Sequence, residues 1–217
     1  MKYLVECGSR SYNIQTNKSD VDVVLLDNID NSDLNDIVNL INQKYNKTDF
    51  HKIDLINFFK NIKFDSLNCY GCQLLYPSKF LINNDLSDYI IKNRDTYINN
   101  INKKVFNRLF LSSTNEYMLS EKIYKIQTKS LAYSILYLSI LNNLNETGKM
   151  SKSIKLSDDI LNFISNIRNN KVSYKDAINY YNDAKENVIN IQHNFNNYSV
   201  DYENQFIKTI SDLVHDK

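Results

Sequence analysis

The stretch GSRSYNIQTNKSDVD, residues 8–22, decides the fold predicted for this chain. It lies between two short apolar runs, YLVEC before it and VVLL after it. The chain has only three glycines, and Gly8 stands directly after the first run. The β-branched content and the alternation of these two apolar runs predict strands over residues 2–7 and 20–26. The loop therefore connects two predicted strands.

Two aspartates at the start of the second strand indicate a cation site. In a strand, Asp20 and Asp22 point to one face, and Val21 and Val23 point to the other. Adjacent carboxylates on one face repel each other unless a cation lies between them. Mg²⁺ takes one or two carboxylates and fills its shell with phosphate and water, so this pair suits it. The alternative interpretation of this D-x-D pattern is an exposed strand edge.

The first half of the loop has the features of a phosphate site. Gly8 has no side chain, so a phosphate could approach the backbone. A short helix expected around residues 10–14 would present free N–H groups to that phosphate, and Arg10 could add a bidentate contact. An ordinary connection from a strand to a helix is the alternative. Together, the loop and the second strand predict a site for Mg²⁺ and a nucleoside triphosphate.

The first 84 residues alternate strand and helix patterns, which predicts an α+β domain with a small mixed sheet and helices on one of its faces. Helical spacing covers residues 33–45 and 54–64. Period-two alternation returns at TDFHKI, residues 48–53, and CQLLYP, residues 72–77, is a candidate final strand.

Residues 85–217 have helical patterns throughout, and we expect an all-helical C-terminal domain that packs on the sheet domain. The longest helix is predicted from Thr114 to about Asn145, with Gly148 as its C-terminal cap. Its apolar side chains could form either an internal core or a dimer seam: Leu131, Ile135, Leu138 and Leu141. Capping signals predict the other helices to begin at Ser157, at Ser173 with Asp176 as its capping-box acid, and near Asp201.

Composition excludes several classes of protein. Lys+Arg is 26 and Asp+Glu is 25, so net charge does not favour a protein that coats nucleic acid. No segment approaches the roughly 18 apolar residues of a membrane span, and the first residues do not form a signal peptide. We expect a cytoplasmic protein without membrane partners. Few glycines and prolines beside many Asn, Ile, Lys and Tyr are typical of an AT-rich genome, such as that of a virus or phage, in which case the compartment is the host cytoplasm.

The three cysteines are Cys7, Cys69 and Cys72. Because their number is odd, they do not indicate a disulfide framework. Cys69-Tyr-Gly-Cys72 is a C-x-x-C pattern, but no second pair accompanies it, and two thiols that flank a turn at Gly71 are the better interpretation than a zinc or redox site.

Gly8-Ser9, ten further residues and then Asp20-Val21-Asp22 resemble the signature of the DNA polymerase β-type nucleotidyltransferase superfamily. The fuller string GSRSY…TNKSDVD resembles its branch of predicted nucleotidyltransferases. Further similarity lies in DFHKIDLINFFK (49–60), KSLAYSILYLSILNNLNETGKM (129–150) and LNFISNIRNN (161–170). The resemblance covers most of the chain, and its motifs concentrate in the first 60 residues.

The resemblance implies roles for particular residues. Asp20 and Asp22 would hold two Mg²⁺ ions, or Mn²⁺ in their place, and a third carboxylate would come from a neighbouring strand. We assign this third position to Asp49, with Asp54 as the alternative, and His51 on the same strand could touch phosphate or sugar. The residues implied to bind the nucleotide are Gly8, Ser9, Arg10, Ser19 and Lys129.

The chain departs from the family pattern at three positions. Asn13 replaces a glycine that usually follows the tyrosine, although Asn tolerates left-handed backbone better than most residues. Tyr133 and Leu136 match positions that commonly carry a His and an Arg. In the family pattern a cation at these positions would help to hold the acceptor or the far end of the nucleotide, and this chain lacks that cation.

The implied reaction moves a nucleoside monophosphate from an NTP such as ATP to an acceptor hydroxyl and releases pyrophosphate. The acceptor is expected to be a protein side chain or an RNA 3′ end. Basic residues of the helical half could bind RNA or could form a solvated face: Lys103, Lys104, Arg108, Lys122, Lys125 and Lys129. The alternative function is a catalytically weak binding protein of the same fold, acting as an antitoxin or a nucleotide sensor.

Overall fold

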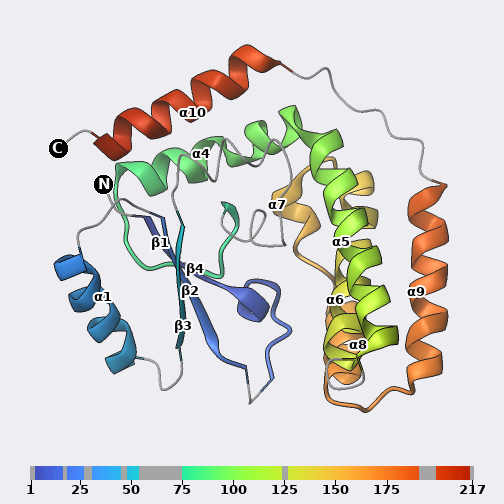
Figure 1. Cartoon of the computed structure of the whole chain (residues 1–217). Helices are drawn as coiled ribbons and strands as arrows, with labels where there is room; N and C mark the ends of the chain where they lie inside the picture. Colours follow the sequence, from blue (N-terminus) through green and yellow to red (C-terminus); the bar gives the residue numbers. More distant parts are fainter. Residues whose placement is uncertain are drawn as a thin grey trace. The chain divides into compact units, whose positions relative to one another are not determined.

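The computed structural model describes residues 3–16, 19–26, 31–44, 48–53, 75–123, 127–190 and 199–215 (Figure 1). The chain forms two compact units, and each is described below by itself. The first contains residues 1–12, 17–97 and 199–217. The second contains residues 13–16 and 98–198.

The first unit is built on a four-stranded mixed sheet of order β3-β2-β1-β4. Strand β1 (Tyr3–Cys7) pairs antiparallel with β2 (Val21–Leu26) and with β4 (Lys79–Phe80), while β2 pairs parallel with β3 (Thr48–Ile53). The predicted first three strands are thus confirmed to within one residue. The predicted strand at 72–77 is wrong at residues 75–77, which are not strand, and residues 72–74 and the predicted helix at 54–64 lie outside the described ranges.

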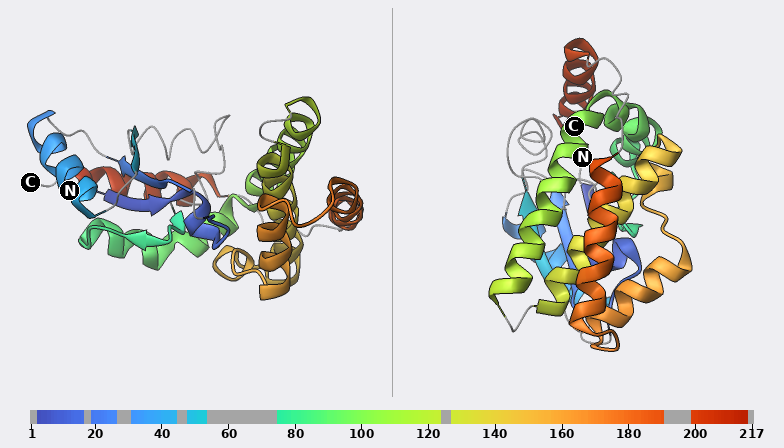
Figure 2. Two further views of the ribbon diagram at one scale, coloured as in Figure 1. Left: turned by 90° about the horizontal axis from the view of Figure 1, so that it is seen from below. Right: turned by 90° about the vertical axis from the view of Figure 1, so that its right-hand side faces the viewer.

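Both faces of the central strands are apolar and therefore need cover. On one face, Leu4, Val21 and Val23 pack against Ile41 of α1 (Asn31–Lys44). On the other face, Val5 and Val24 are paired in register and fully buried. Figure 2 (left) shows α4 (Asp85–Asn100) on the side of the sheet opposite α1. The expectation of helices on one face only is therefore wrong, because every residue of β1 is buried.

The last helix, α10 (Val200–His215), belongs to the same unit as the sheet. Its Phe206 stacks on Tyr97 of α4, with ring centroids 4.2 Å apart, and lies 5.6 Å from the ring of Tyr89. These aromatic contacts join α10 to α4, and both helices are grouped with the sheet up to Tyr97, although the sequence pattern divided the chain after residue 84.

The second unit consists of helices around a buried central one, α6 (Gln127–Thr147). Helices α5 (Asn102–Lys122), α7 (Met150–Ser153), α8 (Asp158–Arg168) and α9 (Tyr174–Ile189) all contact α6. The apolar residues for which a core or a dimer seam was considered are buried inside this unit: Leu131, Ile135, Leu138 and Leu141. Within the described part of the chain, no helix has both the length and the apolar character needed to cross a bilayer.

Helix boundaries in the second unit follow the capping signals with one exception. Gly148 ends α6 with φ +62° and donates its N–H to Leu144 O at 2.9 Å. Ser157 and Ser173 precede α8 and α9, as predicted. The prediction that a helix starts at Thr114 is wrong: Thr114 lies inside α5, and its hydroxyl donates to Phe110 O. A threonine can satisfy its hydroxyl on the preceding turn of a helix, so its type alone does not mark a start.

Candidate active site

The turn that follows β1 approaches β2 very closely at Gly8. Gly8 begins a 3₁₀ helix, η1 (Gly8–Tyr12), with φ +73°. A Cβ atom on Gly8 would lie 1.7 Å from Oδ2 of Asp22 and 2.6 Å from its Cγ. The missing side chain therefore makes room for the Asp22 carboxylate, in addition to permitting the left-handed backbone.

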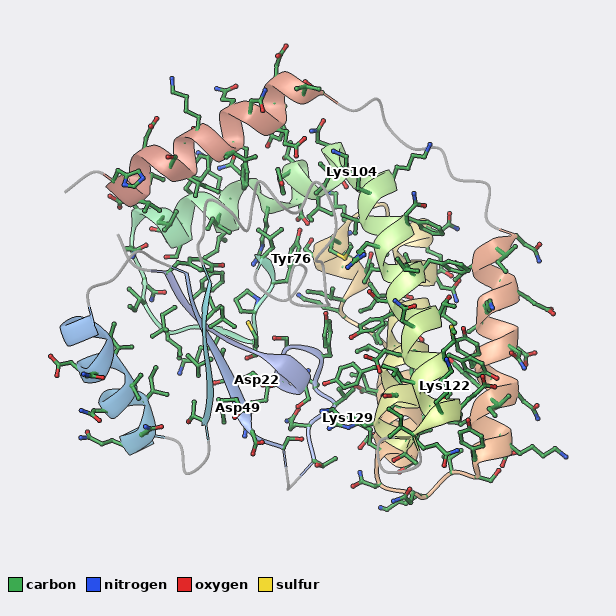
Figure 3. All side chains as sticks on the ribbon, viewed as in Figure 1. Asp22, Asp49, Tyr76, Lys104, Lys122 and Lys129 are labelled. Carbon is green, nitrogen blue, oxygen red and sulfur yellow. The ribbon has the colours of Figure 1, made fainter. Side chains whose placement is uncertain are left out.

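Two of the predicted metal ligands are neighbours across the sheet. Asp22 of β2 is in register with Asp49 of β3. Register partners on adjacent strands point to the same face, and Figure 3 shows both at the same end of the sheet. Asp22 is half-buried and Asp49 is exposed. The pair thus lies where a cation could reach it from solvent.

The remaining predicted carboxylate, Asp20, is placed differently. Asp20 precedes β2, which begins at Val21, so strand alternation does not determine its direction. Asp20 is half-buried. Over the ranges that the structure describes, no group of three or more His, Cys, Asp or Glu side chains is arranged to hold a metal ion. The two-residue pair of Asp22 and Asp49 is accordingly the observed part of the predicted ligand set.

A third residue extends the row of Asp22 and Asp49 onto β1. Cys7 is the register partner of Asp22 and is fully buried. Burial, and then the nearby carboxylates of Asp22 and Glu6, raise the pKa of the Cys7 thiol. The thiol therefore stays protonated and neutral beside Asp22 at physiological pH. Cys7 was not among the residues predicted for the site, although the alternation of β1 opposite β2 could have indicated it.

Arg10, predicted to bind phosphate, pairs with a carboxylate of β1 in this structure. Its Nε lies 4.0 Å from Oε1 of Glu6. The Ser78 hydroxyl lies 3.2 Å from the same Oε1 and 3.0 Å from Glu6 O, while Ser78 N–H donates to Ser11 Oγ. Alternation along β1 assigns Glu6 and Cys7 to opposite faces of the sheet. Arg10 is thus brought to Glu6, and its predicted phosphate contact remains a prediction.

The remaining residues of the predicted loop are largely enclosed. Ser9 is 4 % exposed, and Ser19 is half-buried. Asn13 has φ 55°, in agreement with the view that asparagine can replace glycine there. The helix expected at residues 10–14 starts two residues earlier, since η1 covers Gly8–Tyr12.

The predicted site residues of the second unit lie on α6. Lys129 is exposed (Figure 3), and its role at a nucleotide stays a prediction. Leu136 is fully buried, whereas Tyr133 is half-buried. A cation does lie at Tyr133, because the guanidinium carbon of Arg168 is 5.7 Å from the centroid of its ring. This arginine comes from α8, so no spacing within α6 could have indicated it.

Five predicted positions fall wholly or partly outside the described residues. Asp54, Cys69, Cys72 and Lys125 do so wholly, and for His51 only the backbone position in β3 is described.

The site places the carboxylates of Asp22 and Asp49 on adjacent strands, and the turn at Gly8, which has no side chain, packs against Asp22. Hard divalent cations prefer carboxylate oxygens, so the donor set fits Mg²⁺. Comparisons with protein-family models, with curated proteins and with solved structures find no match for this chain.

Proposed function

We propose that this protein is a Mg²⁺-dependent nucleotidyltransferase that moves a nucleoside monophosphate from an NTP to an acceptor hydroxyl. The observation that supports it most is the register of Asp22 with Asp49, beside the side-chain-free turn at Gly8. Two carboxylates on adjacent parallel strands repel each other, and a bound cation relieves that repulsion. Placing these two carboxylates together is therefore destabilising unless a cation is bound, and we infer that the arrangement serves to bind one.

The fit of a metal to these residues rests on their chemistry and on the packing at Gly8. Asp22 and Asp49 would hold the ion, with Asp20 as a further ligand. When bound, Mg²⁺ would stabilise the attacking and leaving oxygens of the phosphoryl transfer. The carboxylates would orient the ion, and that of Asp22 packs directly against the backbone of Gly8. Gly8 and Ser9 would hold the phosphates of the leaving group through their backbone.

The acceptor that we propose is a protein side chain or an RNA 3′ end. Two exposed lysines of the second unit, Lys122 near the end of α5 and Lys129 near the start of α6, could contact phosphates of an RNA acceptor. A protein acceptor would not need them. Substitution of Lys122 by glutamine would therefore weaken labelling of RNA and leave labelling of protein unchanged, whereas Lys129, which is also predicted to bind the nucleotide, cannot separate the two acceptors.

The proposal is tested with NTPs labelled at the α- or the γ-phosphate. The purified chain is incubated with Mg²⁺, with each of the four α-labelled NTPs in turn, and with either total RNA or cell lysate. We expect the α-label, but not the γ-label, to appear on RNA or on a protein. The control protein is Asp22→Asn. Transfer of the γ-label, or no transfer from any NTP with Mg²⁺ or Mn²⁺, would contradict the proposal, and nucleotide binding without transfer would favour the binding protein considered above.

A further inference from the structure

Part of the chain between the Gly8 turn and the Asp22 strand belongs to the second, helical unit. Residues 13–16 belong to the second compact unit, whereas the chain on either side of them belongs to the first. Ile14 is fully buried. The peptide that joins the two halves of the candidate site is therefore not a free surface loop.

Arg168 makes the specific contact that holds this segment. Its Nη1 donates a hydrogen bond to the carbonyl oxygen of Ile14, across a sequence separation of 154 residues. The same guanidinium lies over the ring of Tyr133 on α6. A guanidinium presents several N–H groups in one plane, so it can bond a carbonyl and lie on an aromatic ring together.

The position of Arg168 is fixed by its own helix. Arg168 is the last residue of α8, and Ile164 and Ile167 of that helix are fully buried. Helix α8 contacts the central helix α6, which also carries Tyr133. The donor that reaches Ile14 is therefore attached to a packed helix, and the loop is held against a rigid support.

We propose that Arg168 is a positioning residue for the candidate active site: through its hydrogen bond to Ile14 it anchors residues 13–16, the segment that connects the Gly8-Ser9 turn to Asp20 and Asp22 along the chain. The inference rests on the proposed function of that site. Without the arginine, the Ile14 carbonyl would be buried and lose a charge-assisted hydrogen bond. The segment would then be held only by the packing of the Ile14 side chain and by its covalent ends.

The first test measures backbone hydrogen exchange in the full chain. Arg168→Ala removes the donor, and Arg168→Lys keeps the charge but places its N–H donors on a single nitrogen without the planar fork. Lys171→Ala is the matched control, because it removes an exposed cation three positions away. We expect amide exchange in peptides covering residues 8–20 to accelerate by at least about tenfold in Arg168→Ala, by less in Arg168→Lys, and not at all in the control. Arg168→Lys also keeps the test usable should Arg168→Ala fail to fold.

The second test separates positioning from general stability. With labelled NTP, Arg168→Ala should lower kcat/KM by about tenfold or more, Arg168→Lys should recover part of that loss, and Lys171→Ala should match the unsubstituted chain. Unchanged exchange over residues 8–20 in both Arg168 variants would overturn the inference, whatever the activity. An unsubstituted chain that transfers no nucleotide would instead overturn the proposed function, while the exchange data would still decide whether Arg168 anchors Ile14.

Discussion

The carboxylate of Asp22 occupies the space in which a side chain on Gly8 would stand. The distance from an ideal Cβ on Gly8 to Asp22 Oδ2 is 1.7 Å, far below any contact that a real Cβ makes. The two residues come from different elements, η1 and β2, and thus connect the phosphate-loop half of the candidate site to its metal-ligand half. Gly8 is needed for the position of Asp22 as well as for the backbone of its own turn.

Gly8→Ala should abolish nucleotidyl transfer and destabilise the protein. The positive φ alone costs about 1–3 kcal/mol for a residue with a side chain, and the methyl group would also displace Asp22. Gly148→Ala is a matched control, because Gly148 has φ +62° with nothing within 4 Å of its Cβ position. It should lose only the backbone contribution and keep full activity. Thermal unfolding and transfer assays measure both, and equal effects of the two substitutions would contradict the role of the Asp22 contact.

Local patterns indicated Gly8, Asp22 and Asp49 as candidate residues, but not the contact between Gly8 and Asp22. Alternation placed Asp22 on one strand face, and TDFHKI defined a strand with the bounds that β3 has, Thr48–Ile53. Parallel pairing of β2 with β3 then put Asp22 opposite Asp49. The pairing itself was not visible in the sequence, and it followed only from the resemblance to a family with a third carboxylate on a neighbouring strand.

Features that depend on contacts between distant segments were not predicted. The Arg168 bond to Ile14 joins residues that no periodic pattern relates. The assignment of α10 to the sheet unit depends on the stacking of Phe206 on Tyr97. Each of these is a tertiary contact, which local propensity does not encode.

Ser173→Ala should destabilise the protein by about 1 kcal/mol, because Ser173 Oγ accepts the Asp176 N–H at 3.1 Å as the N-terminal cap of α9. Ser157→Ala is its natural comparison, since Ser157 precedes α8 and its side chain makes no capping hydrogen bond. We expect that substitution to change stability by much less. Chemical unfolding of the two variants measures the difference, and a larger loss for Ser157→Ala would show that the caps are assigned wrongly.

Stability of the protein should fall as pH rises from about 10 to about 12, in part through Tyr117. Burial, followed by the Glu121 carboxylate, raises the pKa of Tyr117 to about 12 from 10.0. In that range the folded protein keeps a proton that the unfolded chain has lost, so higher pH favours unfolding. Tyr117 stacks on Tyr181 at 4.2 Å, and the pKa of Tyr181 is raised as well, again mainly by burial.

Tyr117→Phe should therefore reduce the slope of melting temperature against pH above about pH 10. Tyr180→Phe is the matched control, because it also removes one tyrosine hydroxyl. The Tyr180 ring packs on Phe163, with ring centroids 4.5 Å apart, and not on the Tyr117–Tyr181 pair. If the slope is the same with and without the Tyr117 hydroxyl, that hydroxyl does not titrate differently in the folded and unfolded states.

The central claim, that Asp22 and Asp49 together bind a divalent cation, is tested most directly by Mn²⁺ binding. Electron paramagnetic resonance would count bound Mn²⁺ in the presence of a non-hydrolysable NTP analogue for the unsubstituted chain, Asp22→Asn and Asp49→Asn. Each substitution replaces a carboxylate by an amide of the same shape and removes one of two repelling charges, so the folded state should be at least as stable. We predict bound Mn²⁺ in the unsubstituted chain and at least about tenfold weaker binding in each variant, with an unchanged or higher melting temperature. Equal Mn²⁺ binding by all three proteins would contradict the claim.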